Sequence, residues 1–190
     1  EDKTIKQQLF KQADSICRQD AVLATNTSSL SISDLASVVS NPYRFIGIHF
    51  FNPVHKMPLV EVVQGKQTSD ETVSIAKSFV QQLNKVPIVI KDAPGFIVNR
   101  LLFSMINEAC YMLEQGLGSV KDIDNAMELG ANFPMGPFQL ADLVGIDITY
   151  NIINELSTAL TGFKPPAAKL KKMIEEGDLG KKVGKGFYQY

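Results

Sequence analysis

The chain has 190 residues and a mass of 20.9 kDa, with 45% hydrophobic and 21% charged residues. This length fits one ordinary domain or two small ones, and the composition excludes disordered, collagen-like and disulfide-scaffold proteins. The 19 basic and 20 acidic residues give a net charge of −1, which argues against nucleic-acid binding, since such proteins need a basic surface that displaces phosphate counterions.

The first half of the chain alternates predicted helices and strands. Apolar residues recur every three or four positions in the helices, whereas the strands are short, unbroken apolar runs. We predict a helix over 4–18, a strand over 21–25, a helix over 35–39, strands over 45–51 and 59–63, a helix capped by Asp70, and a strand over 86–90. The first strand is expected to be buried on both faces, and the last to lie at an edge because Pro87 cannot donate to a ladder. The alternation predicts a parallel or mixed sheet covered by helices.

After Pro94-Gly95 the pattern changes to helical segments separated by glycines. We predict helices over 96–115, after a Ser119 cap, from Pro137, over 148–160 with an Asp147 cap, and over 166–176. The fold class is therefore α/β followed by all-α, with an α/β domain over 1–91 and a helical domain over 94–190.

Two titratable side chains lie inside apolar strands, His49 in the strand 45–51 and Glu61 in the strand 59–63. A buried imidazole and a buried carboxylate each need a partner, and each could satisfy the other. Such a pair is either a structural contact or the acid–base centre of an enzyme, and these residues alone leave both readings open. His55 lies among turn residues and is expected at the surface.

Two polar positions are candidate ligand contacts. Ser28 belongs to the turn 26–29 that follows the first strand, at the sheet edge where open α/β proteins bind ligands. Asn99 lies next to the predicted domain boundary, where a site between domains could use it. A plain polar turn and a helix cap or interhelical hydrogen bond are the respective alternatives.

Several catalytic signatures are absent from the sequence: G-x-G-x-x-G, the Walker A loop, H-E-x-x-H and G-x-S-x-G. Cys17 and Cys110 are the only cysteines, too few for a disulfide framework or a four-thiolate zinc site, so we predict no metal and a reducing compartment. No run approaches the roughly 18 apolar residues of a membrane span, so none is expected.

Five separated blocks resemble the L-3-hydroxyacyl-CoA dehydrogenase family of the short-chain type. They are ATNTSSL at 24–30, IHFFNPV at 48–54, LVEVV at 59–63, DAPGFIVNR at 92–100 and PMGP at 134–137. The resemblance covers essentially the whole chain and ends in a similar motif at 180–188. It implies an oxidoreductase that converts L-3-hydroxyacyl-CoA to 3-ketoacyl-CoA with NAD in fatty-acid β-oxidation.

The resemblance also implies roles for individual residues. His49 matches the general base, Glu61 matches its carboxylate partner, and Ser28 and Asn99 match residues that bind the reacting end of the acyl-CoA substrate. The positions that match cofactor contacts are Glu1, Lys6, Ser28, Asn52 and Lys182.

The chain departs from the family because it lacks the G-x-G-x-x-G loop that binds the pyrophosphate. Residues 1–91 thus resemble the later part of a Rossmann-like NAD-binding domain, and 94–190 a helical substrate-binding and dimerisation domain. We expect a homodimer, a truncated protein with little or no turnover by this chain alone, and a location in the mitochondrial matrix if eukaryotic or the cytoplasm otherwise. The alternatives are a non-enzymatic helical dimerisation or CoA-ester-binding module, and a different hydroxyacid dehydrogenase of similar layout.

Overall fold

The computed structural model describes residues 2–190, so the predicted cofactor contact Glu1 lies outside the described residues. The chain divides into two compact units, residues 1–97 and residues 98–190, which we describe separately. The first holds a sheet with helices and the second is helical, which confirms the predicted fold class. The predicted domain boundaries, and the functions given to the two domains, stay predictions.

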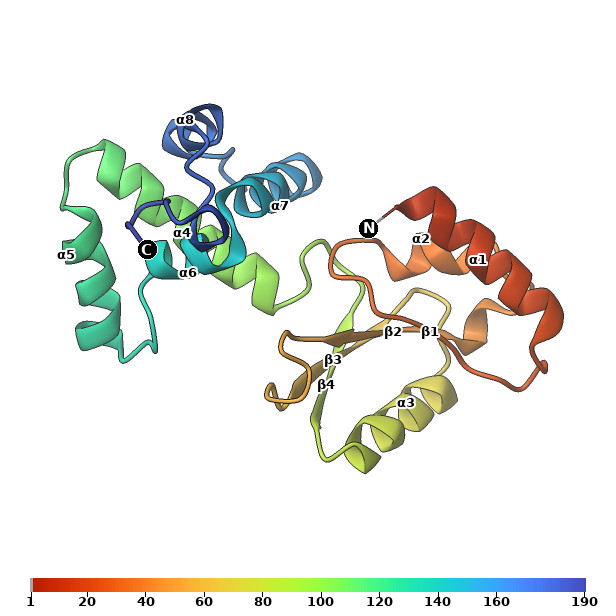
Figure 1. The fold of residues 1–190 in the computed structure, drawn as a ribbon. Helices are drawn as coiled ribbons and strands as arrows, with labels where there is room; N and C mark the ends of the chain where they lie inside the picture. The colour runs from red at the N-terminus through yellow and green to blue at the C-terminus, as the bar shows by residue number, and fades with distance from the viewer. Residues whose placement is uncertain (1) are drawn as a thin grey trace. The chain divides into compact units, whose positions relative to one another are not determined.

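The first unit is built on a four-stranded mixed sheet in the order β1-β2-β3-β4 (Figure 1). Its strands are β1 (Leu23–Thr25), β2 (Phe45–Phe50), β3 (Leu59–Gln64) and β4 (Val86–Lys91). Strands β1 and β2 are parallel, β3 runs antiparallel to β2, and β4 is parallel to β3. The predicted edge position of the strand that contains Pro87 is confirmed.

Three helices cover the two faces of this sheet: α1 (Lys3–Ile16), α2 (Ile32–Ala36) and α3 (Asp70–Gln82). Helices α1 and α2 lie on one face and α3 on the other (Figure 1). A short 3-10 turn, Pro42–Arg44, precedes β2. Helix α2 approaches β2 closely because Gly47 has no side chain. A Cβ atom there would lie 2.6 Å from Ile32 Cδ1 and 2.9 Å from Val63 Cβ.

Two local predictions for this unit are wrong. The first strand is not buried on both faces, because Ala24 is exposed. Ala24 pairs with Ile46, whose side chain packs against α3. Helix α3 packs mainly against β2, β3 and β4, so the side chain of Ala24 on β1 stays exposed. The cap of α3 is Ser69 and not Asp70, since the Ser69 side chain accepts a hydrogen bond from the Thr72 amide.

The second unit packs its helices around one apolar core. They are α4 (Val98–Glu114), α5 (Val120–Asn125), a π-helical turn (Ala126–Gly130), α6 (Pro137–Val144), α7 (Ile146–Ala159), α8 (Ala168–Glu176) and a 3-10 turn (Lys181–Val183). Ser119 forms the predicted cap of α5, and Pro137 begins α6 as predicted. Asp147 is not a cap: it lies in the first turn of α7, after Gly145. Within residues 2–190, every helix is too short or too polar to cross a membrane.

Two buried aspartates hold the C-terminal segment of this unit. The Asp142 carboxylate accepts hydrogen bonds from the backbone amides of Phe187 at 2.8 Å and Tyr188 at 2.9 Å, and from the Tyr190 hydroxyl at 3.1 Å. The Tyr188 hydroxyl donates to Asp124 at 2.8 Å. Burial raises the pKa of Asp142, although these donors oppose the rise. Burial, and then the charge of Asp142, raises the pKa of Tyr190 to about 12, so this hydroxyl keeps its proton at neutral pH.

We predict that Asp142→Asn destabilises the second unit by about 1–3 kcal/mol. Both oxygens of Asp142 accept hydrogen bonds, whereas asparagine has one oxygen and an NH₂ group, which cannot accept. Urea unfolding followed by tyrosine fluorescence measures the loss, since the chain has no tryptophan and four of its five tyrosines lie in this unit. The exposed Glu155→Gln is the control and should change stability by less than about 0.5 kcal/mol. Equal midpoints for the two variants would contradict the prediction.

Candidate active site

The register of the sheet brings His49 and Glu61 together. They are directly opposite each other in the antiparallel ladder of β2 and β3, where paired side chains share a face at short distance. His49 Nδ1 lies 2.7 Å from Glu61 Oε2, and the two residues are 4% and 0% exposed. Each of the two buried groups therefore has the other as a partner, as the sequence had left possible.

The second carboxylate oxygen of Glu61 is also engaged. Glu61 Oε1 accepts a hydrogen bond of 3.0 Å from the backbone amide of Ile97, which follows β4. A carboxylate offers only acceptors, so the His49 nitrogen that faces Glu61, Nδ1, carries the proton. In the neutral imidazole this leaves Nε2 with a lone pair, as a general base requires.

Ser28 completes a line of three side chains. Its Oγ lies 3.1 Å from His49 Nε2, on the opposite side of the ring from Glu61. The turn that carries Ser28 is held by Thr27 Oγ1, which accepts from the Leu30 amide at 3.0 Å. Asn26 Oδ1 accepts from the Phe50 amide at 3.0 Å and so joins the carboxyl ends of β1 and β2. The structure thus brings together three of the four predicted catalytic residues.

Two phenylalanines flank this line and were not predicted as site residues. The ring centroids of Phe51 and Phe96 lie 4.6 Å and 5.5 Å from that of the His49 imidazole. Phe96 is only 4% exposed. The signal in the sequence was its place in the DAPGF block, but a hydrophobic residue next to a glycine does not indicate which side chain it will contact.

The other predicted positions are distributed over both units. In the first, Lys6 is half-buried on α1, and Asn52 is exposed immediately after β2, before a cis peptide bond to Pro53. In the second, Asn99 lies in the first turn of α4, and the Lys182 ammonium contacts both oxygens of Asp147 at 2.5 and 2.7 Å. Burial acts to raise the pKa of Asp147, but the hydrogen bonds from Lys182 and the Ile148 amide and the charge of Lys182 together lower it.

His55 is exposed, as predicted. Among residues 2–190 no group of three or more His, Cys, Asp or Glu side chains is arranged to hold a metal ion.

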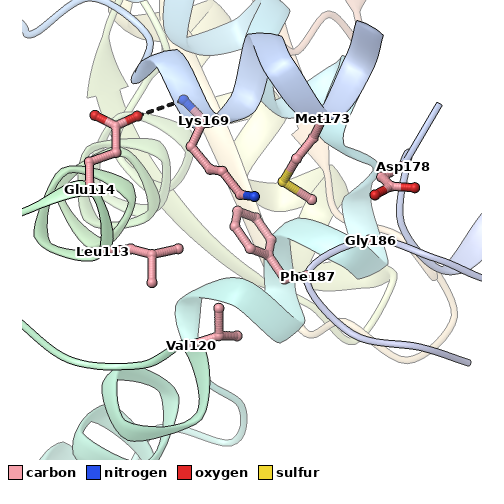
Figure 2. A pocket seen from close by; sticks show the side chains of 8 residues that line it. All are labelled: Leu113, Glu114, Val120, Lys169, Met173, Asp178, Gly186 and Phe187. Atoms are coloured by element: carbon pink, nitrogen blue, oxygen red, sulfur yellow. Dashed lines mark hydrogen bonds between the residues drawn. The ribbon is translucent and has the colours of Figure 1, made fainter. Parts of the chain in front are cut away.

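A separate hollow of about 390 Å³ lies within the second unit (Figure 2). The Lys169 side chain extends toward Phe187 in this hollow, and Glu114 accepts a hydrogen bond from the Lys169 backbone amide. Its lining residues are Leu113, Glu114, Val120, Lys169, Met173, Asp178, Gly186 and Phe187. None of the predicted site residues is among them, so we assign this hollow no part in the candidate active site.

Comparison with protein families gives two matches that together cover nearly the whole chain. Residues 1–93 match the 3-hydroxyacyl-CoA dehydrogenase NAD binding domain, and residues 95–190 match the 3-hydroxyacyl-CoA dehydrogenase C-terminal domain. Together with the sheet and the histidine–carboxylate pair, these matches define an oxidoreductase with an NAD-binding domain.

Individual relatives agree. The 3-hydroxybutyryl-CoA dehydrogenase of Clostridioides difficile is 47% identical over 191 residues, which cover 100% of this chain and 68% of that protein. The mitochondrial hydroxyacyl-coenzyme A dehydrogenase of Sus scrofa is 46% identical, with 61% of its length covered. The crystal structure of (S)-3-hydroxybutyryl-CoA dehydrogenase from Ralstonia eutropha matches with a TM-score of 0.96 and 45% identity, over 100% of this chain and 68% of that one. The chain belongs to the 3-hydroxyacyl-CoA dehydrogenase family and spans about two thirds of the length of these relatives.

Two side chains of the first unit have the chemistry to contact NAD. Neutral polar side chains at the carboxyl ends of β1 and β2, Ser28 and Asn52, suit an amide and ribose hydroxyls. The pyrophosphate would need a glycine-rich loop at a helix N-terminus, and this sequence contains no G-x-G-x-x-G. The chemistry of Ser28 and Asn52 is therefore compatible with a polar part of NAD other than its pyrophosphate.

We predict that Glu61→Gln destabilises the first unit by about 1–3 kcal/mol. A glutamine offers one acceptor oxygen, so its amide group must face either His49 Nδ1 or the Ile97 amide, both of which are donors. Urea unfolding followed by far-UV circular dichroism measures the loss. The exposed Glu71→Gln on α3 serves as the matched control, with a change within about 0.5 kcal/mol. Unaltered stability in Glu61→Gln would show that its two hydrogen bonds contribute little.

Proposed function

We propose that the protein oxidises an L-3-hydroxyacyl-CoA to the 3-ketoacyl-CoA with NAD, and that His49 is its general base. The observation that carries the proposal is the line Ser28–His49–Glu61, in which the buried carboxylate holds the proton on Nδ1 and leaves on Nε2 a lone pair, which faces the Ser28 hydroxyl. Several relatives are named 3-hydroxybutyryl-CoA dehydrogenases, so 3-hydroxybutyryl-CoA is the first substrate to test.

In this proposal His49 Nε2 accepts the proton of the substrate 3-hydroxyl group. Glu61 then stabilises the imidazolium through the 2.7 Å contact to Nδ1 and keeps the ring in its orientation. Ser28 donates a hydrogen bond to the reacting oxygen, which favours the charge that develops there, and Asn99 is the other proposed substrate contact. These roles make Ser28 a substrate contact as well as a neighbour of the base.

NAD, when bound, supplies the hydride acceptor. Ser28 and Asn52 would hold its nicotinamide end, and Lys6, Lys182 and Glu1 are the remaining proposed contacts. Because the sequence lacks a pyrophosphate loop, little or no turnover by this chain alone stays part of the proposal.

The wider setting of the reaction is also part of the proposal. We place it in fatty-acid β-oxidation, in the mitochondrial matrix if the source is eukaryotic and in the cytoplasm otherwise. The relatives include a mitochondrial enzyme of Sus scrofa, which supports the mitochondrial location, and bacterial enzymes, which support the cytoplasmic one. We further propose a homodimer formed through the helical second unit.

We predict that His49→Gln lowers kcat by about 10²–10⁴-fold, the usual cost of removing a general base. The measurement is NADH formation from 3-hydroxybutyryl-CoA by a version of the protein that carries a pyrophosphate-binding loop. His55→Gln is the control, because His55 is exposed and lies outside the line of three side chains. A His49→Gln enzyme with unchanged kcat would refute the assignment of the base.

We also predict that acetoacetyl-CoA raises the thermal midpoint of this 190-residue chain, because a ligand that binds only the folded state stabilises it. A Ser28→Ala variant should show a smaller rise at the same ligand concentration, since it lacks one proposed donor. The absence of any rise with CoA esters would favour the alternative, a non-enzymatic dimerisation module, over a substrate-binding protein.

A further inference from the structure

One short segment, residues 92–97, contacts His49 and Glu61 directly and also contacts the start of α2, which follows the turn that carries Ser28. We call this segment the clasp. It begins directly after β4 and ends where α4 begins, and its sequence is Asp-Ala-Pro-Gly-Phe-Ile.

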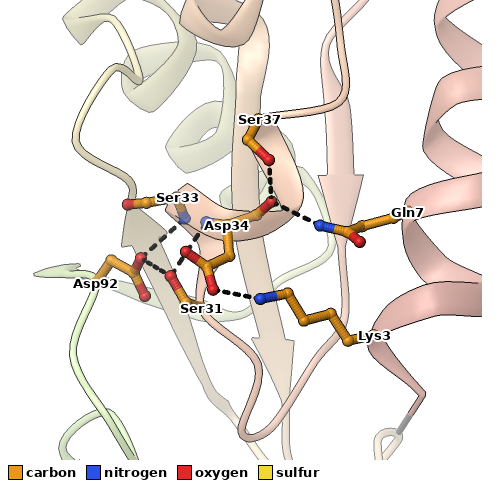
Figure 3. Close-up of polar contacts among 7 residues, drawn as sticks. All are labelled: Lys3, Gln7, Ser31, Ser33, Asp34, Ser37 and Asp92. Carbon is orange, nitrogen blue, oxygen red and sulfur yellow. Dashed lines mark hydrogen bonds and ion pairs between the residues drawn. The ribbon is translucent and has the colours of Figure 1, made fainter.

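The first residue of the clasp fixes the start of α2. Asp92 Oδ2 accepts hydrogen bonds from the Ser31 hydroxyl at 2.9 Å and from the Ser33 amide at 2.8 Å (Figure 3). The Asp92 amide donates to the Gln64 carbonyl of β3 at 2.9 Å. Because α2 follows the turn that carries Ser28, Asp92 joins that turn to the carboxyl ends of β3 and β4.

The last residues of the clasp reach the other two members. Gly95 and Phe96 both have left-handed backbone, with φ values of 73° and 50°. That conformation is unfavourable for a phenylalanine and persists only where the surroundings stabilise it. Here it directs the Phe96 ring toward His49, with 5.5 Å between the ring centroids, and presents the Ile97 amide to Glu61 at 3.0 Å.

We propose that the clasp keeps the three side chains in line and that Phe96 is the positioning residue for His49. The proposal rests on the proposed function, in which the orientation of His49 determines the rate. It assigns Phe96 no contact with substrate or cofactor. Phe96 acts by packing against the His49 imidazole and by orienting the next residue, Ile97, so that its amide donates to Glu61.

A purely structural role for Phe96 makes a different prediction. Phe96 belongs to the same core cluster as Phe10, and the two are 4% and 8% exposed. Phe10 packs edge-on against Phe45, with 4.7 Å between the ring centroids. If Phe96 only fills the core, Phe96→Leu and Phe10→Leu should have the same consequences for His49.

The test is proton NMR of the 190-residue chain, which needs neither substrate nor cofactor. The buried, hydrogen-bonded Nδ1 proton of His49 should give a low-field signal, whereas the exposed His55 exchanges its ring protons with water. A His55→Gln variant confirms the assignment, since the chain has only two histidines. We expect Phe96→Leu to accelerate exchange of this proton with solvent by at least about tenfold, by analogy with the rate cost of small misplacements in a site. Phe10→Leu should leave it unchanged, and Phe96→Tyr, which keeps the ring, should preserve it.

Equal exchange in Phe96→Leu and Phe10→Leu overturns the proposal. Should Phe96→Leu fail to fold, Gly95→Ala disturbs the same left-handed turn while retaining the ring, and an unchanged His49 signal in that variant also overturns it. If CoA esters instead leave the thermal midpoint of the chain unchanged, the proposed function is wrong while the NMR result still stands, so the two failures are distinguishable.

Discussion

The hydrogen bond between His49 and Glu61 is the constraint on which the first unit depends. A carboxylate with no exposed surface must find donors inside the protein, because burying it unpaired costs several kcal/mol. One donor comes from the facing strand and the other from the backbone that leaves β4. The antiparallel register of β2 and β3 and the path of the chain after β4 are therefore both tied to a single side chain. A slip of one residue in that register would move Glu61 to the opposite face of the sheet.

The second unit also buries carboxylates, and other kinds of group donate hydrogen bonds to them. Asp124 and Asp142 are each 1% exposed and are satisfied by backbone amides and tyrosine hydroxyls. Gly136 and Gly186 allow this, since a side chain at either position would collide with the carboxylate. In both units, then, a buried acid organises a segment that has no regular secondary structure of its own.

The sequence predicts those features that depend on local pattern. The alternating strands and helices, the edge position of the strand with Pro87, the cap at Ser119 and the start of a helix at Pro137 follow from periodicity and turn chemistry. That His49 and Glu61 could pair follows from the need of each buried group for a partner. The predictions that failed depend on tertiary packing. Ala24 is exposed because of where α3 lies, and Asp147 pairs with Lys182, which is 35 positions away in the chain. The left-handed backbone of Phe96 gives no sign in its residue type, so its contact with His49 could be found only in three dimensions.

Asn26 has a consequence for the length of β1, which contains only three residues. Its side-chain oxygen accepts from the Phe50 amide, a bond that a backbone carbonyl would otherwise provide. The side chain thus continues the pairing of the two strands for one step after the main chain has left the sheet. The main chain can therefore turn away after Thr25, and Ser28 contacts the imidazole from the loop that follows. The hydrogen bond from Phe50 to Asn26 still sets the spacing of the two strand ends.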